Sequence, residues 1–150
     1  MERDFPDDTS VRFDYLPAIR ASLALGHRDA AKAIEVLQVA APFDISSPRS
    51  ATFAHFGALY PVYLRGQAYL ATHKGAEATS EFQKIVDHPG ITIGDAFSVL
   101  AHLGLARAYA MQGDTVRARA AYQDFLTLWK DADPDVPILK QAKAEYAKLQ

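Results

Sequence analysis

Small and apolar residues recur along the chain in one pattern that appears three times. The five positions of each copy are separated by steps of three, nine, four and three residues. Steps of three and four join residues on one face of a helix, so each copy predicts two helices with a turn inside the nine-residue step. The copies are Ala21, Ala24, Ala33, Leu37 and Ala40; Gly66, Tyr69, Ala78, Phe82 and Ile85; and Ala106, Tyr109, Ala118, Tyr122 and Phe125.

The residues between the copies set the limits of the predicted elements. We expect one all-α domain over 1–150, with helical hairpins over about 10–41, 51–88 and 95–130 and a final helix over 136–149. Pro42 is expected to end the second helix of the first hairpin near Ala41. Pro17 and Pro61 should each kink a helix or mark where it begins. If Pro61 marks where a helix begins, 51–72 divides into a short apolar helix and a longer one from Tyr60.

Aspartates are the expected N-terminal caps, because their side chains accept hydrogen bonds from the first free backbone N–H groups of a helix. Asp95 and Asp114 stand before the two helices of the third hairpin, and Asp135 stands before the final helix. Between the second and third hairpins, 91–94 is expected to be a short extended piece. The final helix is amphipathic, and such a helix can close the exposed end of a stack of hairpins.

The pattern resembles the tetratricopeptide repeat, a helical hairpin of about 34 residues. The likeness rests on the small residue and Tyr of the first helix, on the turn Gly113-Asp114, and on the small, aromatic and apolar series of the second helix. It is closest over 99–132 and weakest in the first copy, and the copies recur after 45 and 40 residues. The resemblance implies a right-handed α-solenoid of three hairpins with a C-terminal capping helix.

A concave groove lined by the first helix of each hairpin is the usual binding surface of that family, and the resemblance implies that a partner peptide or helix lies there. The expected groove residues are mostly aromatic and aliphatic, which favours an apolar segment as the partner. If a connection or the final helix covers this face, the same residues are core. They are Tyr15, Ala18, Ile19, Ser22, Tyr60, Tyr63, Leu64, Gln67, Leu100, Leu103, Arg107 and Met111.

The net charge and the distribution of apolar residues limit the classes of partner that we expect. A net charge of −2 over 150 residues provides no general attraction to nucleic acid or to an anionic membrane. The longest uncharged stretch, 50–64, is too short to span a bilayer as a helix, and the acidic start lacks the apolar segment of a secretion signal. We therefore expect no nucleic-acid binding and no membrane insertion. The compartment stays open, and a chain that stands alone is expected to be cytoplasmic.

Catalytic and metal-binding motifs are not recognisable. Without cysteine there are no thiolate ligands or nucleophiles, and the five histidines have no ligand spacing. Asp131, Asp133 and Asp135 alternate as the first ligands of a calcium loop do, but Val136 replaces its central glycine and Ala142 its closing glutamate. We therefore expect no cofactor, no metal site and no enzyme activity.

A wider resemblance lies in 118–134. This stretch is similar to the C-terminal repeat tails of bacterial signalling proteins with a serine/threonine kinase or winged-helix domain. If the chain is the tail of a membrane-anchored kinase, the expected compartment is extracytoplasmic. The leading hypothesis is a non-catalytic interaction scaffold, a module of such a larger protein. Two alternatives stay open: a self-association module that forms a homodimer through the same face, and an enzyme with an unrecognised site in one of the long connections.

Overall fold

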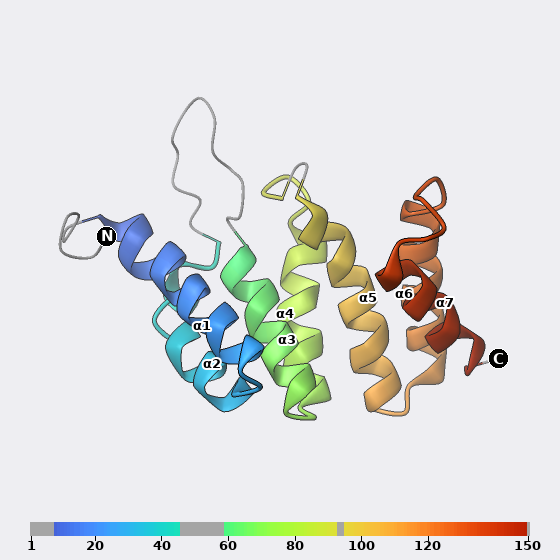
Figure 1. Ribbon diagram of the computed structural model, residues 1–150, viewed down its shortest axis with the longest axis horizontal. Coiled ribbons are helices and arrows are strands. Elements are labelled where there is room, and N and C mark those ends of the chain that lie inside the picture. Colours follow the sequence, from blue (N-terminus) through green and yellow to red (C-terminus); the bar gives the residue numbers. More distant parts are fainter. Residues whose placement is uncertain (1–7, 46–58, 93–94, 150) are drawn as a thin grey trace.

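The computed structural model describes residues 8–45, 59–92 and 95–149, and these residues form helices joined by turns (Figure 1). A π-helical segment, η1 (Val11–Tyr15), leads into α1, and a 3-10 turn, η2 (Ala41–Phe43), follows α2. The predicted all-α class is confirmed for the described residues. The α-helices are α1 (Leu16–Gly26), α2 (Ala30–Leu37), α3 (Tyr60–Ala71), α4 (Gly75–Asp87), α5 (Ala96–Met111), α6 (Thr115–Leu128) and α7 (Pro137–Ala147).

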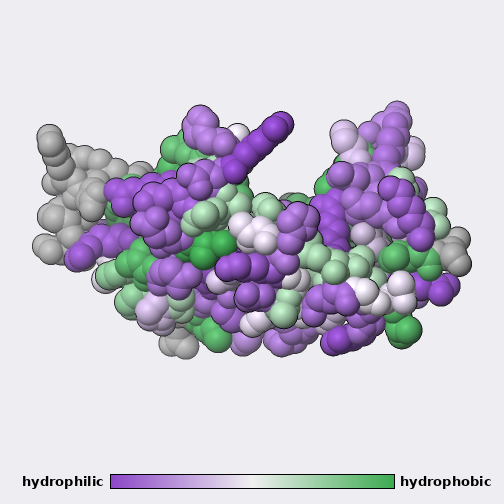
Figure 2. All heavy atoms as spheres, turned by 90° about the horizontal axis from the view of Figure 1, so that it is seen from below, coloured by the Kyte–Doolittle hydropathy of each residue, from purple (hydrophilic) through white to green (hydrophobic). Residues whose placement is uncertain are grey.

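The helices follow one another in a row. Each packs against the next in the chain from α1 to α7. In addition, α1 contacts α3 and α3 contacts α5, whereas α2 with α4, and α4 with α6, make at most marginal contact. The odd-numbered helices α1, α3 and α5 therefore lie closer together and form one face of the row, which we call the odd-helix face. Figure 2 shows an outline that is hollowed between two raised parts covered largely by hydrophilic residues.

The turns inside the helix pairs α1/α2, α3/α4 and α5/α6 have one geometry. Each has a residue with a left-handed backbone, namely Arg28 (φ 61°), His73 (φ 57°) and Gly113 (φ 77°). The next residue donates its N–H to the carbonyl five positions earlier, which is a common way for a helix to end. These bonds join Asp29 to Ala24 (2.8 Å), Lys74 to Tyr69 (2.9 Å) and Asp114 to Tyr109 (3.0 Å). The first helix pair has the same turn geometry, although Arg28 stands there in place of the glycine of the Gly113-Asp114 turn.

The positions of the sequence pattern form the core between these helices. In every copy the first, third, fourth and fifth positions are buried and the second is half-buried. One buried cluster joins α1, α2 and α3, and a larger one continues from α3 to α7. Phe82 of α4 lies between two glycines, since an added Cβ would stand 2.8 Å from its ring at Gly66 of α3 and 2.6 Å at Gly104 of α5. The small residues therefore admit an aromatic ring between neighbouring helices.

Pro61 lies in the first turn of α3, which confirms that it marks a helix start. Proline is tolerated there because its missing N–H has no partner within the helix. Pro17 is the second residue of α1, but helical backbone continues into it from η1, so it marks the change from π-helical to α-helical backbone and not the start of the helical stretch. The short helix expected before Tyr60 falls in 51–58, outside the described residues.

Some predicted boundaries and caps are wrong. Helix α2 ends at Leu37, not near Ala41, because the following residues tighten into turns, and Pro42 lies within η2. Asp114 caps α6 as expected, with its carboxylate 3.0 Å from the N–H of Arg117. Asp95 precedes α5, but its side chain makes no capping hydrogen bond.

The final helix also starts differently from expectation. Its N-cap residue is Val136, and the carboxylate of Asp135 lies 2.7 Å from the Nζ of Lys140 instead of capping the helix. The segment expected to be extended begins as a turn, in which Ile91 donates its N–H to the carbonyl of His88 (3.0 Å). Residues 93–94, the rest of that segment, are outside the described part of the chain.

Candidate functional site

An apolar groove lies on the odd-helix face between α1 and the start of α3. Its volume is about 560 Å³. Tyr15, Ile19 and Leu23 follow one another at intervals of four residues, so their side chains form a ridge along α1. Across from them, Tyr60 stands at the first position of α3. We call this surface the α1–α3 groove; it is lined by Tyr15, Ala18, Ile19, Ser22, Leu23 and Tyr60.

The large side chains of the groove are unusually exposed for apolar residues. Tyr15 is 43% exposed, Ile19 49% and Leu23 60%, whereas Ala18, at 7%, is buried. A small residue beside exposed large ones leaves a depression into which another apolar side chain fits. Contiguous apolar surface of this kind is a common mark of interaction sites.

An aromatic cluster continues the groove along α3 toward α5. The ring centroid of Tyr60 lies 6.2 Å from that of Tyr63 and 5.7 Å from that of Phe97. Tyr63 also contacts Phe82 of the core, with centroids 5.9 Å apart. Burial raises the pKa of Tyr63, an effect that Arg107 partly opposes, so its hydroxyl stays protonated at neutral pH. Tyr60 is thus held by rings anchored in the core, and its position does not depend on a ligand.

The α5–α7 end of the face is polar and internally paired. The guanidinium of Arg107 donates two hydrogen bonds to the carboxylate of Glu145 on α7, at 2.9 and 3.0 Å. The hydroxyl of Tyr122 on α6 donates to the same carboxylate at 2.9 Å. Burial raises the pKa of Tyr122, so this donor remains protonated. Arg107 therefore joins α7 to the preceding helix pair; this role was not predicted, because it depends on Glu145, which lies 38 positions away along the chain.

The predicted groove residues divide into four groups. Tyr15, Ile19, Ser22 and Tyr60 line the α1–α3 groove, while Tyr63 and Gln67 are half-buried beside it and Met111 is exposed at the end of α5. Leu64 (5% exposed) and Leu103 (1%) are core residues, so they present no surface to a partner. Arg107 is engaged by Glu145. Leu23 also lines the groove and was not predicted, although its position four residues after Ile19 puts it on the same helix face.

A buried ionic network lies between the first helix pair and the second and was not predicted. The side chain of Arg65 on α3 is 2% exposed, and it pairs with Asp44 at 2.5 Å and with Glu81 of α4 at 2.7 Å. It also donates to the carbonyl of Leu37 at 3.3 Å, and Lys84 lies 3.2 Å from both carboxylates. The network connects the first helix pair to the second. The side chains of Arg65, Asp44 and Glu81 are at most 10% exposed, so these three charges hold the helices together and are not available to a partner.

Within the described residues, no cluster of three or more histidine, aspartate or glutamate side chains could hold a metal ion. None of the helices described there is long and apolar enough to cross a bilayer. Comparison of the chain with family models, with curated proteins and with solved structures finds no match.

Proposed function

We propose that the chain is a non-catalytic interaction module that binds an apolar peptide or helix of a partner protein in the α1–α3 groove. The observation that carries the proposal is the exposed ridge of Tyr15, Ile19 and Leu23 facing Tyr60. Aromatic and aliphatic side chains around a central depression are typical of interface hot spots. In line with the resemblance noted above, such a module would belong to a larger bacterial signalling protein.

The proposal includes an architecture, a right-handed α-solenoid of three tetratricopeptide-like hairpins with α7 as the cap. Its support is the common turn geometry of α1/α2, α3/α4 and α5/α6 and the equivalent burial of their pattern positions. In such an architecture the odd-helix face is the inner face, and extended inner surfaces are what stacked repeats use for binding.

The chemistry of the groove defines the partner. Among the described residues no charged side chain lines it, and the polar atoms they contribute are the hydroxyls of Ser22, Tyr15 and Tyr60 together with backbone atoms. A buried charge without a counter-charge is costly, so a charged anchor is disfavoured there. An amphipathic helix that inserts two aliphatic side chains one turn apart would match the one-turn spacing of Ile19 and Leu23.

A peptide-display selection with matched variants tests the proposal. Twelve-residue peptides selected on the unmodified chain are measured by fluorescence polarisation against Ile19→Arg and against Val116→Arg. Val116, on α6, is 79% exposed and does not line the groove, so it controls for the introduction of an exposed arginine. We expect Ile19→Arg to weaken binding by about 2 kcal/mol or more, roughly thirtyfold, and Val116→Arg to leave it unchanged.

Two results would contradict the proposal: no enriched peptide, or equal loss in both variants. Light scattering over a wide concentration range decides the alternative of self-association. A dimer that Ile19→Arg dissociates, and Val116→Arg does not, would make a second copy of the chain the occupant of the groove.

A further inference from the structure

Two rows of side chains run beside the exposed ridge of the α1–α3 groove. Ala18 and Ser22, each one position before a ridge residue, lie on the side of the ridge toward α3 and line the groove. Arg12, Leu16 and Arg20 are also four residues apart, so they share a helix face on the other side of the ridge. Both arginines are exposed. We call this second row the basic flank.

The charged side chains on the odd-helix face are mainly arginines. Helices α1, α3 and α5, together with η1, carry four arginines, no lysine and no carboxylate except that of Asp14. Arg65 and Arg107 are paired with carboxylates of other elements. Asp14 is half-buried and stands one position before the ridge, on the side toward α3. The exposed positive charge of this face therefore lies on the basic flank, with Arg12 and Arg20.

The guanidinium of Arg12 is held close to its helix. It lies 5.3 Å from the ring centroid of Phe13, and that ring stacks on Phe43 with centroids 4.4 Å apart. A guanidinium that lies over a ring still has N–H groups along its edge, and these can donate to a carboxylate. A partner carboxylate would therefore meet a cation that has already lost part of its freedom.

From this charge pattern we propose that the occupant of the α1–α3 groove is an acidic amphipathic helix of a partner protein. Its aliphatic side chains enter the groove, and carboxylates along one side of it pair with Arg12 and Arg20. Arginine suits this role because its planar donors match both oxygens of a carboxylate. The two arginines are eight positions apart, about 12 Å along a helix, so the partner carboxylates are expected about two turns apart. The inference rests on the function proposed above and names the chemistry of the partner.

The same charges disfavour a second copy of the chain as the occupant. An isologous dimer places one patch of surface against the same patch of its partner, so the basic flanks of the two copies would meet. Like charges that face each other across an interface are unfavourable. Charge complementarity therefore favours an acidic segment of a different protein.

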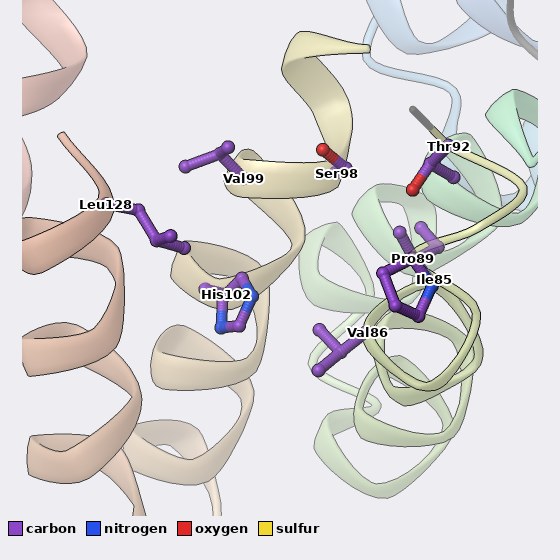
Figure 3. A pocket seen from close by; sticks show the side chains of 8 residues that line it. All are labelled: Ile85, Val86, Pro89, Thr92, Ser98, Val99, His102 and Leu128. Atoms are coloured by element: carbon purple, nitrogen blue, oxygen red, sulfur yellow. The ribbon is translucent and has the colours of Figure 1, made fainter. Parts of the chain in front are cut away.

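A second pocket, between the end of α4 and the start of α5, does not offer this match (Figure 3). Its volume is about 270 Å³, and Val86, Val99 and Leu128 are among its lining residues. None of the described lining residues is an arginine or a lysine. Burial lowers the pKa of His102 in this pocket, and the charge that partly opposes the shift is the carboxylate of Asp124. An acidic helix would meet a like charge there, whereas it meets opposite charges at the basic flank.

A charge-biased peptide library tests the inference. Twelve-residue peptides carry two leucines one turn apart, with glutamate, glutamine or lysine in equal proportions at the positions beside them. After selection on the unmodified chain, we expect glutamate to exceed lysine by about threefold or more on one side of the leucines. Enriched peptides without a charge preference, or with an excess of lysine, would overturn this inference and leave the proposed function standing. Absence of any enriched peptide would overturn both.

Matched variants test the role of the two arginines. The best acidic peptide and its glutamine isostere are measured by fluorescence polarisation against the double variant Arg12→Gln with Arg20→Gln. The control is Arg119→Gln, which removes an exposed arginine of α6. We expect the acidic peptide to bind roughly threefold to tenfold more tightly than its isostere to the unmodified chain and to the control, and equally tightly to the double variant.

Salt provides a second measurement of the same effect. The preference for the acidic peptide should disappear as the salt concentration is raised from about 0.01 M to about 1 M, because exposed charges are then screened. A preference that survives either the double variant or the high salt would refute the pairing with Arg12 and Arg20. A dimer in light scattering that Ile19→Arg dissociates would overturn the choice of occupant.

Discussion

Replacing Gly104 by alanine tests the packing on which the row of helices depends. A Cβ at Gly104 would stand 2.6–2.7 Å from three ring atoms of Phe82. Non-bonded carbon atoms pack at about 3.5–4.0 Å, so the overlap is close to 1 Å. The ring has no room to retreat, because Phe82 is fully buried and its ring also lies against Gly66, where an added Cβ would stand 2.8 Å away.

Two opposing effects determine the size of the change. Overpacking of a close-packed core typically costs about 1–3 kcal/mol. Alanine in place of glycine inside a helix stabilises it by about 1 kcal/mol. The two effects leave a net decrease in the free energy of unfolding of up to about 2 kcal/mol for Gly104→Ala, which for a chain of this size lowers Tm by up to roughly 8 °C. Urea unfolding followed by circular dichroism measures the loss.

Gly26→Ala is the matched control. Gly26 is the last residue of α1, and an added Cβ there would have no neighbour within 4 Å. This variant retains the gain in helix propensity without the clash, so its stability should equal or exceed that of the unmodified chain. A Gly104→Ala variant that is stabilised as much as Gly26→Ala would refute the close approach of α5 to Phe82.

A double-mutant cycle identifies the clashing partner. Phe82→Leu removes the ring atoms that the new Cβ would meet, so in that background Gly104→Ala should cost little or become stabilising. We expect a coupling free energy of at least about 1 kcal/mol between the two positions. Additive effects would place the cost elsewhere.

Two further predictions concern buried charge. Arg65→Ala leaves the carboxylates of Asp44 and Glu81 buried with Lys84 as their remaining cationic partner, so it should lower the free energy of unfolding in urea by about 3–5 kcal/mol. The control Lys84→Ala removes the more exposed cation and should lower it by less than about 1 kcal/mol. Similar losses in both variants would contradict the central role of Arg65. Burial raises the pKa of Asp14 to about 6 from its ordinary 3.8. The folded state therefore binds this proton more tightly than the unfolded state does. As a result, the contribution of Asp14 to the stability of the fold decreases as the pH rises from about 4 to 6. Asp14→Asn should therefore be more stable than the unmodified chain at pH 7 and lose this advantage as the pH is lowered through about 6 toward 4, as urea midpoints will measure; an advantage independent of pH would exclude desolvation of this carboxyl.

Local periodicity was sufficient to identify the buried positions. The spacing of Ala78, Phe82 and Ile85 puts them on one helix face, and all three are buried in the structure. This pattern can be recognised in the sequence because the backbone hydrogen bonds of a helix lie within the helix. Residues three and four positions apart therefore share a face, independently of the tertiary contacts. The turn at Gly113 was predicted on an equally local basis, because glycine adopts the left-handed backbone conformation of this turn (φ 77°) without a steric clash.

Exposure on the odd-helix face could not be predicted in the same way. Leu64 and Leu103 were expected in the groove but are core residues, while Tyr15 and Ile19 are exposed as expected. A helix inside a row contacts both a preceding and a following neighbour, so its apolar face is wider than one stripe. The helical period shows that a residue is apolar on that face, but it does not show which neighbour covers it.

The sequence by itself determined the helices, the register of the repeated pattern and the small residues at the helix contacts, because these depend on spacings of a few residues. Only the tertiary structure decided that Arg65 joins Asp44 to Glu81 and that Glu145 neutralises Arg107, since these partners lie 16 to 38 positions apart along the chain. It also decided which apolar residues stay exposed between α1 and α3. Ion pairs and grooves depend on where separate helices come to lie, and that is set by the packing of the whole row.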